Sequence, residues 1–370
     1  MATASNQYRP DYAVPPGWIL EERLEVQGLS HAEFARRCGR SPKLISEIIS
    51  GKAPLEPETA LQFERVLGVD ASIWLGIEAD YQLYQARKAA ATEAAESTAW
   101  LKSFPITELV RRRAIKPTRS EADAVSELLS FFRVASVEAW RMKHGMANVT
   151  YRHSPSFKSS EAALATWLRL GELAAAEQEC AGYNDSQFRK ALKEIRDLTR
   201  SPIEDALAAS RDLCNQAGVA LALIRPFQKT ALSGAAWWLS PRKAVIQLSA
   251  RHKTDDHLWF SFFHEAAHIL LHSKKDVFVD STDNDAIADL EKEANEWASN
   301  MLVPRSQLNR FVATTPRSEA AVRSFAQEQG IAPGIVVGML QYEGHLPWTH
   351  LNRLKVRLVW QSAESKNAKA

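Results

Sequence analysis

The chain has 370 residues, of which 45% are hydrophobic and 24% are charged, as in an ordinary globular protein. This length predicts two or three domains, because a single hydrophobic core rarely organises so many residues. The 46 Lys and Arg residues nearly balance the 44 Asp and Glu residues, for a net charge of +2, so any nucleic-acid-binding surface has to be a local basic patch.

Cysteine spacing and hydropathy exclude further classes of protein. Cys38, Cys180 and Cys214 lie far apart in the sequence, which argues against a disulfide framework and against a thiolate zinc site. The sequence shows neither an apolar leader at its start nor a run of about 18 apolar residues. We therefore predict a cytoplasmic protein with no membrane partner.

Two short helices around a tight turn are the first predicted elements. Ser30 and Glu33 have the spacing of a capping box that opens a helix over residues 32–38, and Gly39 supplies the turn. A second helix over residues 41–49 follows at once, with Ser as its cap and Pro at its first position. This pattern predicts a helix-turn-helix.

The charges around this turn favour DNA binding. Residues 30–52 carry five basic side chains and two acidic ones. Because the second helix of a helix-turn-helix lies in the major groove, we predict contacts to base edges from its outward residues, Ser41, Lys43, Ser46 and Glu47. Arg40 and Lys52 are predicted to bind phosphates. The alternative is a small helical bundle whose basic residues are only solvated.

Further along, the hydrophobic period changes from helical to extended and back. An Ala-rich helical spacer and a helical region up to about residue 200 precede a buried strand at residues 219–224 and a hairpin. Helices then dominate to about residue 360. We predict four segments: a helix-turn-helix domain at 1–88, a helical connector at 89–200, an α+β domain at 201–360 and a disordered tail at 361–370.

The run His264-Glu265-Ala266-Ala267-His268 has the H-E-x-x-H pattern. On a helix, histidines at positions i and i+4 lie on one face and can bind one zinc ion, while the Glu beside the first acts as general base. The apolar residues on both sides predict a buried helix. His264 and His268 are therefore predicted as metal ligands and Glu265 as the catalytic base.

A third ligand is predicted from helical phase. Residues 289–298 contain four acids and an Asn, and Glu291 shares a face with Asn295 and with small alanines that permit close approach of the two helices. We predict Glu291 as the third ligand, with Glu293 as the reserve choice, and Asn295 as a partner that orients a ligating histidine. His272, one turn beyond His268, is predicted to turn away from the ion, at the surface or behind the ligands.

Three protein ligands leave a fourth position open, as in catalytic zinc sites. The predicted reaction is hydrolysis of a peptide bond by a metal-activated water, with Glu265 accepting its proton and passing it to the leaving amine. The strand Ala244–Leu248 has two interpretations. It binds an extended substrate as an added strand, or it serves only the fold.

Both motif regions resemble known families. The N-terminal region, about residues 14–87, resembles the lambda-repressor-like domain of HigA-type antitoxins through the runs Pro16–Leu20, Gly28–Ser30, Ser41–Lys52, Pro57–Leu61 and Trp74-Leu75. This resemblance implies operator binding as a homodimer.

Residues 200–345 resemble the ImmA/IrrE family of zinc metallopeptidases through the runs Trp238–Pro241, Lys253–Asp256, Phe262–His272, Glu293–Ala298, Leu302–Pro304 and Ile331–Gly338. Ala267 and Trp297 depart from the Gly and Phe usual there, which puts packing rather than chemistry in doubt.

Together the resemblances imply a mainly α fold with a small β-sheet: an N-terminal five-helix helix-turn-helix domain, a helical linker region and a C-terminal α+β zincin-like domain of gluzincin type. They imply one Zn²⁺ per chain, operator DNA as a partner, and a protein substrate that is a helix-turn-helix repressor or a toxin–antitoxin component. The alternative is a HigA-like regulator or antitoxin whose peptidase-like domain senses or binds a partner without turnover.

Overall fold

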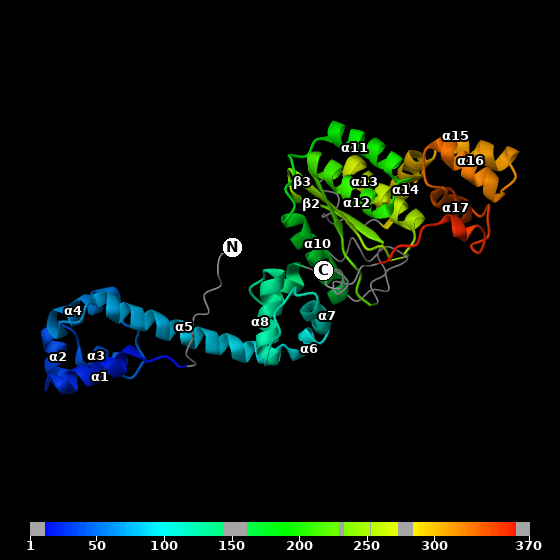
Figure 1. Ribbon diagram of the computed structural model, residues 1–370. Coiled ribbons are helices and arrows are strands. Elements are labelled where there is room, and N and C mark those ends of the chain that lie inside the picture. Colours follow the sequence, from blue (N-terminus) through cyan, green and yellow to red (C-terminus); the bar gives the residue numbers. More distant parts are fainter. Residues whose placement is uncertain (1–11, 144–160, 229–232, 252, 273–283, 360–370) are drawn as a thin grey trace, which may run out of the picture. The chain divides into compact units, whose positions relative to one another are not determined.

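The computed structural model describes residues 12–143, 161–228, 233–251, 253–272 and 284–359. The chain forms two compact units, one comprising Met1–Thr98 and Thr118–Ser126 and the other Ala99–Pro117 and Glu127–Ala370. It is mainly helical with one small sheet (Figure 1), as predicted. Among the described residues, no helix has the length and apolarity needed to cross a membrane.

The first unit contains the predicted five-helix domain. Its helices are α1 (Pro16–Val26), α2 (His31–Cys38), α3 (Pro42–Ile49), α4 (Pro57–Leu67) and α5 (Ala71–Glu96) (Figure 1). Phe34, Phe63 and Trp74 are fully buried at its centre, and their rings make tilted and edge-to-face contacts. Such aromatic burial stabilises small helical domains.

The turn between α2 and α3 follows from its capping residues. The Ser30 hydroxyl accepts a hydrogen bond from the Glu33 amide at 3.2 Å, and Gly39 ends α2 in the left-handed conformation with φ 64°. Ser41 then caps α3. In the described structure the Glu33 carboxylate pairs with arginines of its own helix and not with Ser30, so only one half of the expected capping box forms.

The second unit begins with helices that precede the sheet. They are α7 (Ile106–Arg111), α10 (Glu161–Ala176), α11 (Asp185–Leu198) and α12 (Ile203–Gln216), while α6 (Thr98–Leu101) and α8 (Glu121–Phe132) extend across the unit boundaries. Trp100, Phe104, Phe132 and Trp140 form an aromatic cluster with ring centroids 4.8–5.8 Å apart. The helices α10 and α11, which fall within the predicted connector, contact the sheet and α12, respectively.

The sheet has three strands, β1 (Val219–Leu223), β2 (Gly234–Ser240) and β3 (Lys243–Leu248), in the order β1-β3-β2. β3 is parallel to β1 and antiparallel to β2. Because β3 pairs on both sides, it has no free edge for an added strand. The interpretation of Ala244–Leu248 as a substrate-binding strand is therefore wrong, and within the described part of the chain β2 is the edge strand beside it.

The two faces of the sheet pack against different helices. Alternate residues such as Val219 and Leu221 join the large core that contains α12 and α13 (Asp255–Leu271). Their neighbour Ala220 instead packs with Ala175 of α10. This alternation is the two-residue period of a strand buried on both faces, and it fixes α13 against β2 and β3.

The C-terminal helices are α14 (Asn284–Leu302), α15 (Arg305–Thr314), α16 (Glu319–Gln329) and α17 (Pro333–Tyr342), followed by a short 3-10 turn, η1 (Asn352–Leu354). The segment that directly follows η1 anchors the first turn of α13 through buried polar contacts. Lys355 Nζ lies 2.7 Å from Asp256 Oδ2, and the Val356 amide donates to Asp255 Oδ1 at 2.8 Å. A Cβ on Gly338 would come within 2.5 Å of Asp256 Oδ2, so glycine permits α17 to approach.

Candidate metal centre

Two histidines of the H-E-x-x-H motif project from one face of α13. The helix is held in the core by Phe262, Phe263 and Ala266, so the imidazoles of His264 and His268 are only 15% and 16% exposed. Their Nε2 atoms lie 3.1 Å apart. The helix spacing of four residues thus brings two nitrogen donors together in a largely dry environment.

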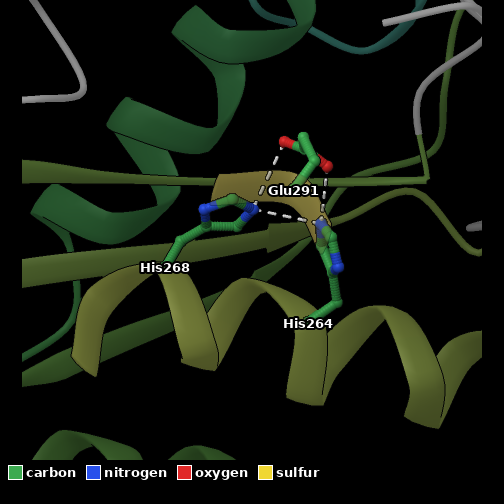
Figure 2. A group of neighbouring side chains, drawn as sticks. All are labelled: His264, His268 and Glu291. Atoms are coloured by element: carbon green, nitrogen blue, oxygen red, sulfur yellow. Dashed lines mark hydrogen bonds and ion pairs between the residues drawn. The ribbon is translucent and has the colours of Figure 1, made fainter. Parts of the chain in front are cut away.

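Glu291 of α14 completes a group of three. Its carboxylate oxygens lie 3.3 Å from His264 Nε2 and 3.4 Å from His268 Nε2, and the three donor atoms are all within 4.8 Å of one another. Figure 2 shows the carboxylate facing both imidazoles from the neighbouring helix. Ala294 and Ala298 are fully buried, which lets α14 approach α13 closely.

The reserve choice, Glu293, does not belong to this group. Its carboxylate lies 3.4 Å from Nε2 of His272. The His272 side chain is 4% exposed, and its Nδ1 lies 2.9 Å from Nδ1 of His268. His272 therefore faces the side of the His268 ring opposite to Glu291, as its helical position predicts, but it is buried rather than at the surface.

The donor set fits a divalent metal ion. Two imidazole nitrogens and a carboxylate oxygen are the ligands of catalytic zinc sites and also suit other transition metals. The electrostatics agree, because the site favours a positive charge. Burial opposes protonation of His264, but the hydrogen bond to Glu291 and the charge of Glu265 together raise its pKa. Burial would raise the pKa of Glu291, yet the histidines hold it below its ordinary value.

The second histidine has the opposite shift. Burial and the neighbouring His264 lower the pKa of His268 to about 4, so its ring stays neutral, the form that binds a metal. Asn295, predicted to orient a ligating histidine, lies close enough to His264 to help raise the pKa of that histidine, although Nδ1 of His264 has no hydrogen bond of full geometry in the described structure. The predicted role of Asn295 thus concerns His264, whereas His272 contacts His268.

Glu265 lies beside these donors, buried between α13 and the edge strand β2. Burial raises its pKa to about 7. The carboxylate is so close to the start of β2 that a Cβ on Gly234 would lie 2.5 Å from Oε1. No sequence motif points to Gly234. Its only signal was a glycine at the start of a strand, which often marks a close approach of the backbone to another group.

The predicted DNA-contacting residues are arranged around α3. Lys43 is 83% exposed and lies 3.8 Å from Glu47, and Ser46 and Lys52 are exposed. Ser41 is engaged as the cap of α3. Arg40 donates to Gln62 Oε1 at 2.7 Å and lies 3.5 Å from Glu58. Lys43, Ser46 and Lys52 are therefore accessible, while Arg40 would have to exchange partners to bind a phosphate.

Comparison with known proteins finds a matching family for each of the two regions. Residues 20–74 match a helix-turn-helix family, and residues 214–336 match the family described as IrrE N-terminal-like domain. An uncharacterized HTH-type transcriptional regulator of Escherichia coli, YddM, is 36% identical over 73 residues, which are 20% of this chain and 78% of YddM. Virulence-associated protein I of Dichelobacter nodosus is 38% identical over 77 residues, 20% of this chain and 71% of that protein.

Fold and site together define a DNA-binding regulator that carries a domain of metallopeptidase type. More specifically, the chain belongs to the helix-turn-helix transcriptional regulators through its N-terminal domain, and its residues 214–336 form an IrrE-like peptidase domain.

Proposed function

We propose that this chain is a DNA-binding regulatory zinc metallopeptidase that hydrolyses a peptide bond of a partner protein, either a helix-turn-helix repressor or a toxin–antitoxin component. The observation that carries the proposal is the convergence of His264, His268 and Glu291 with Glu265 buried beside them. A structural site has no need of a carboxylate next to its ligands, whereas hydrolysis requires a base there.

In this mechanism His264, His268 and Glu291 would hold the zinc ion. When bound, the ion would polarise the scissile carbonyl and make water a better nucleophile. Glu265 accepts a proton from the attacking water at its carboxylate and delivers that proton to the nitrogen of the leaving amine. The wall formed by α13 and β2 limits access of bulk water to Glu265, which strengthens its interaction with the reacting atoms.

The edge strand β2 supports binding of an extended substrate. One side of β2 pairs with β3, and among the residues that the structure describes its other side is the edge of the sheet. A peptide that adds to this edge satisfies the backbone groups of both chains. Since β2 begins at Gly234, against Glu265, a peptide bound along β2 passes close to the proposed base.

The N-terminal domain directs the protein to a specific site on DNA. Helix-turn-helix dimers bind operators that have two half-sites. We therefore propose that this chain binds its operator as a homodimer. Accessible Lys43 and Lys52 support contact of α3 and the following turn with DNA. Cleavage of a partner at the operator would then change transcription locally.

The test is co-expression with the product of the neighbouring gene, comparing the wild-type chain with Glu265→Gln. We expect cleavage of the partner by the wild type alone, with equal zinc content in both proteins. Equal metal content shows that Glu265→Gln removes the base and not the ion. Cleavage by both proteins, or by neither, would contradict the proposal.

A second candidate is a HigA-like regulator or antitoxin whose C-terminal domain senses or binds a partner without cutting it. The observation in its favour is the similarity to YddM, a transcriptional regulator by name, over 73 residues that make up 20% of this chain. This candidate predicts stable complexes of the partner with both proteins and unchanged operator binding by Glu265→Gln. A cleaved partner that accumulates only with the wild type argues against it.

A further inference from the structure

A line of polar side chains continues behind His268, away from Glu291. His264, His268 and His272 follow one another on α13 at intervals of four residues, with ring centroids 4.7 Å and 4.9 Å apart. Nδ1 of His268 lies 2.9 Å from Nδ1 of His272, and Nε2 of His272 lies 3.4 Å from a carboxylate oxygen of Glu293. The line thus leads from the proposed metal centre to an acid on α14.

The two nitrogens of each imidazole define how protons are placed along this line. Nε2 of His268 faces Glu291 and His264, so a ligating His268 uses Nε2 and carries its proton on Nδ1. That proton is donated to Nδ1 of His272. The His272 proton then lies on Nε2, where it points at Glu293. Each step has one donor and one acceptor.

We infer that His272 and Glu293 are positioning residues that fix the ring orientation and the tautomer of His268 for metal binding. This inference rests on the proposed function, because it assumes that His268 is a ligand. Hydrogen-bonded partners of ligating histidines set ring orientation and raise ligand basicity. Here the partner is a second histidine, and the acid acts through it.

Burial supports a specific role for His272. Its side chain is 4% exposed, and its Nε2 is buried without a hydrogen bond of full geometry in the described structure. A buried polar ring is costly unless it is partnered, and an apolar side chain would fill the same space at lower cost. The Glu293 carboxylate, although 58% exposed, turns toward His272.

The experiment measures zinc affinity of the full-length protein by competition with a chromophoric chelator, which needs no substrate. His272→Leu removes both nitrogens, and we expect a loss of roughly 10- to 100-fold in affinity. His272→Asn keeps a polar atom near the position of Nδ1 and is expected to recover most of the affinity. Cobalt absorption spectra of the same variants should show a changed ligand geometry for His272→Leu and a native one for His272→Asn.

Glu293 has a matched control on its own helix. We expect Glu293→Ala to weaken zinc binding several-fold, and Glu293→Gln, which retains an acceptor oxygen, to weaken it less. Glu296 is exposed on the same helix, and Glu296→Ala removes the same charge. It should leave the affinity unchanged, which separates the contact with His272 from a general loss of negative charge.

The outcomes distinguish this inference from the proposed function. A wild-type chain that binds no zinc overturns the proposed metal centre itself. If the wild type and His272→Leu bind zinc with equal affinity, the inference is overturned and the proposed metal centre stands. If His272→Leu fails to fold, the Glu293 variants provide the test, because Glu293 is exposed. Equal zinc affinities of Glu293→Ala and Glu296→Ala would then overturn the inference.

Discussion

Gly234 and Glu265 are in contact at the point where the edge strand meets the helix of the H-E-x-x-H motif. A Cβ at residue 234 would lie 2.5 Å from Oε1 and 2.7 Å from Cγ of Glu265, closer than packed atoms come. The backbone of β2 therefore forms one wall around the proposed base. Because residue 234 has no Cβ, the edge strand β2 and the H-E-x-x-H helix α13 can pack this closely.

Gly234→Ala should displace the Glu265 carboxylate. We expect a loss of about 1–3 kcal/mol in the free energy of unfolding, typical of overpacking, and a strong loss of any peptidase activity with zinc retained. The same change in a Glu265→Ala background should cost much less, because the smaller side chain leaves room. Denaturant unfolding of the four proteins measures this coupling. Equal costs in both backgrounds would show that the contact is not the cause.

Removal of the proposed third ligand should abolish tight metal binding. Glu291→Ala leaves two histidines, and we expect a zinc stoichiometry well below the one ion per chain proposed for the wild type.

Chelation should abolish the proposed peptidase activity reversibly, with activity restored by zinc, while circular dichroism shows that helices persist. Loss of helicity on chelation would instead indicate a structural metal.

Asp255 should make stability depend on pH. Burial raises its pKa from the ordinary value of 3.8 to about 6, so the folded chain holds the proton more tightly than the unfolded chain does. The stabilisation is fully present below about pH 4 and is lost as the pH rises through about 6. Over this window it amounts to about 3 kcal/mol for a shift of about two units.

Asp255→Asn removes this titration and keeps an acceptor for the Val356 amide. We expect the variant to gain stability relative to the wild type as the pH rises from 4 to 7. Urea unfolding at several pH values, followed on the second unit, measures the difference. A difference that is constant across this range would contradict the assignment.

The ion pair of Lys355 and Asp256 should be costly to break. Both side chains are almost fully buried, at 8% and 5% exposure, with Nζ and Oδ2 2.7 Å apart. Lys355→Met leaves a buried carboxylate without its partner. We expect the free energy of unfolding to fall by about 3–5 kcal/mol. Thermal unfolding checks it. Replacing both residues with apolar ones should restore much of the loss, and a double variant as unstable as the single one would argue against charge burial as the cause.

Lys43 and Lys52 should affect DNA binding in different ways. If Lys52 binds a phosphate, Lys52→Ala weakens binding to all sequences and reduces the slope of log affinity against log salt by about 1. If Lys43 contacts a base edge, Lys43→Ala reduces discrimination between operator and random DNA. Fluorescence anisotropy with the promoter of the chain's own gene measures both. Neither change should alter folding, because both side chains are exposed.

The sequence by itself determined the elements whose cause is local. Capping residues around Gly39 and the fixed turn of an α-helix predicted α2, α3 and the shared face of His264 and His268. Helical phase also distinguished Glu291 from Glu293, because only one of them shares the face of Ala294 and Ala298. These predictions needed no knowledge of distant residues.

Tertiary structure decided what depends on neighbours far along the chain. Strand order placed β3 between β1 and β2, and no local pattern tells which strand of a hairpin pairs with a third one. Only in the folded chain is His272 buried beside Glu293 of α14, although its rotation away from the proposed metal position was predictable. The contact between Gly234 and Glu265 likewise arises only when sheet and helix pack. A glycine has no side chain, so the hydrophobic pattern of the sequence does not predict this contact.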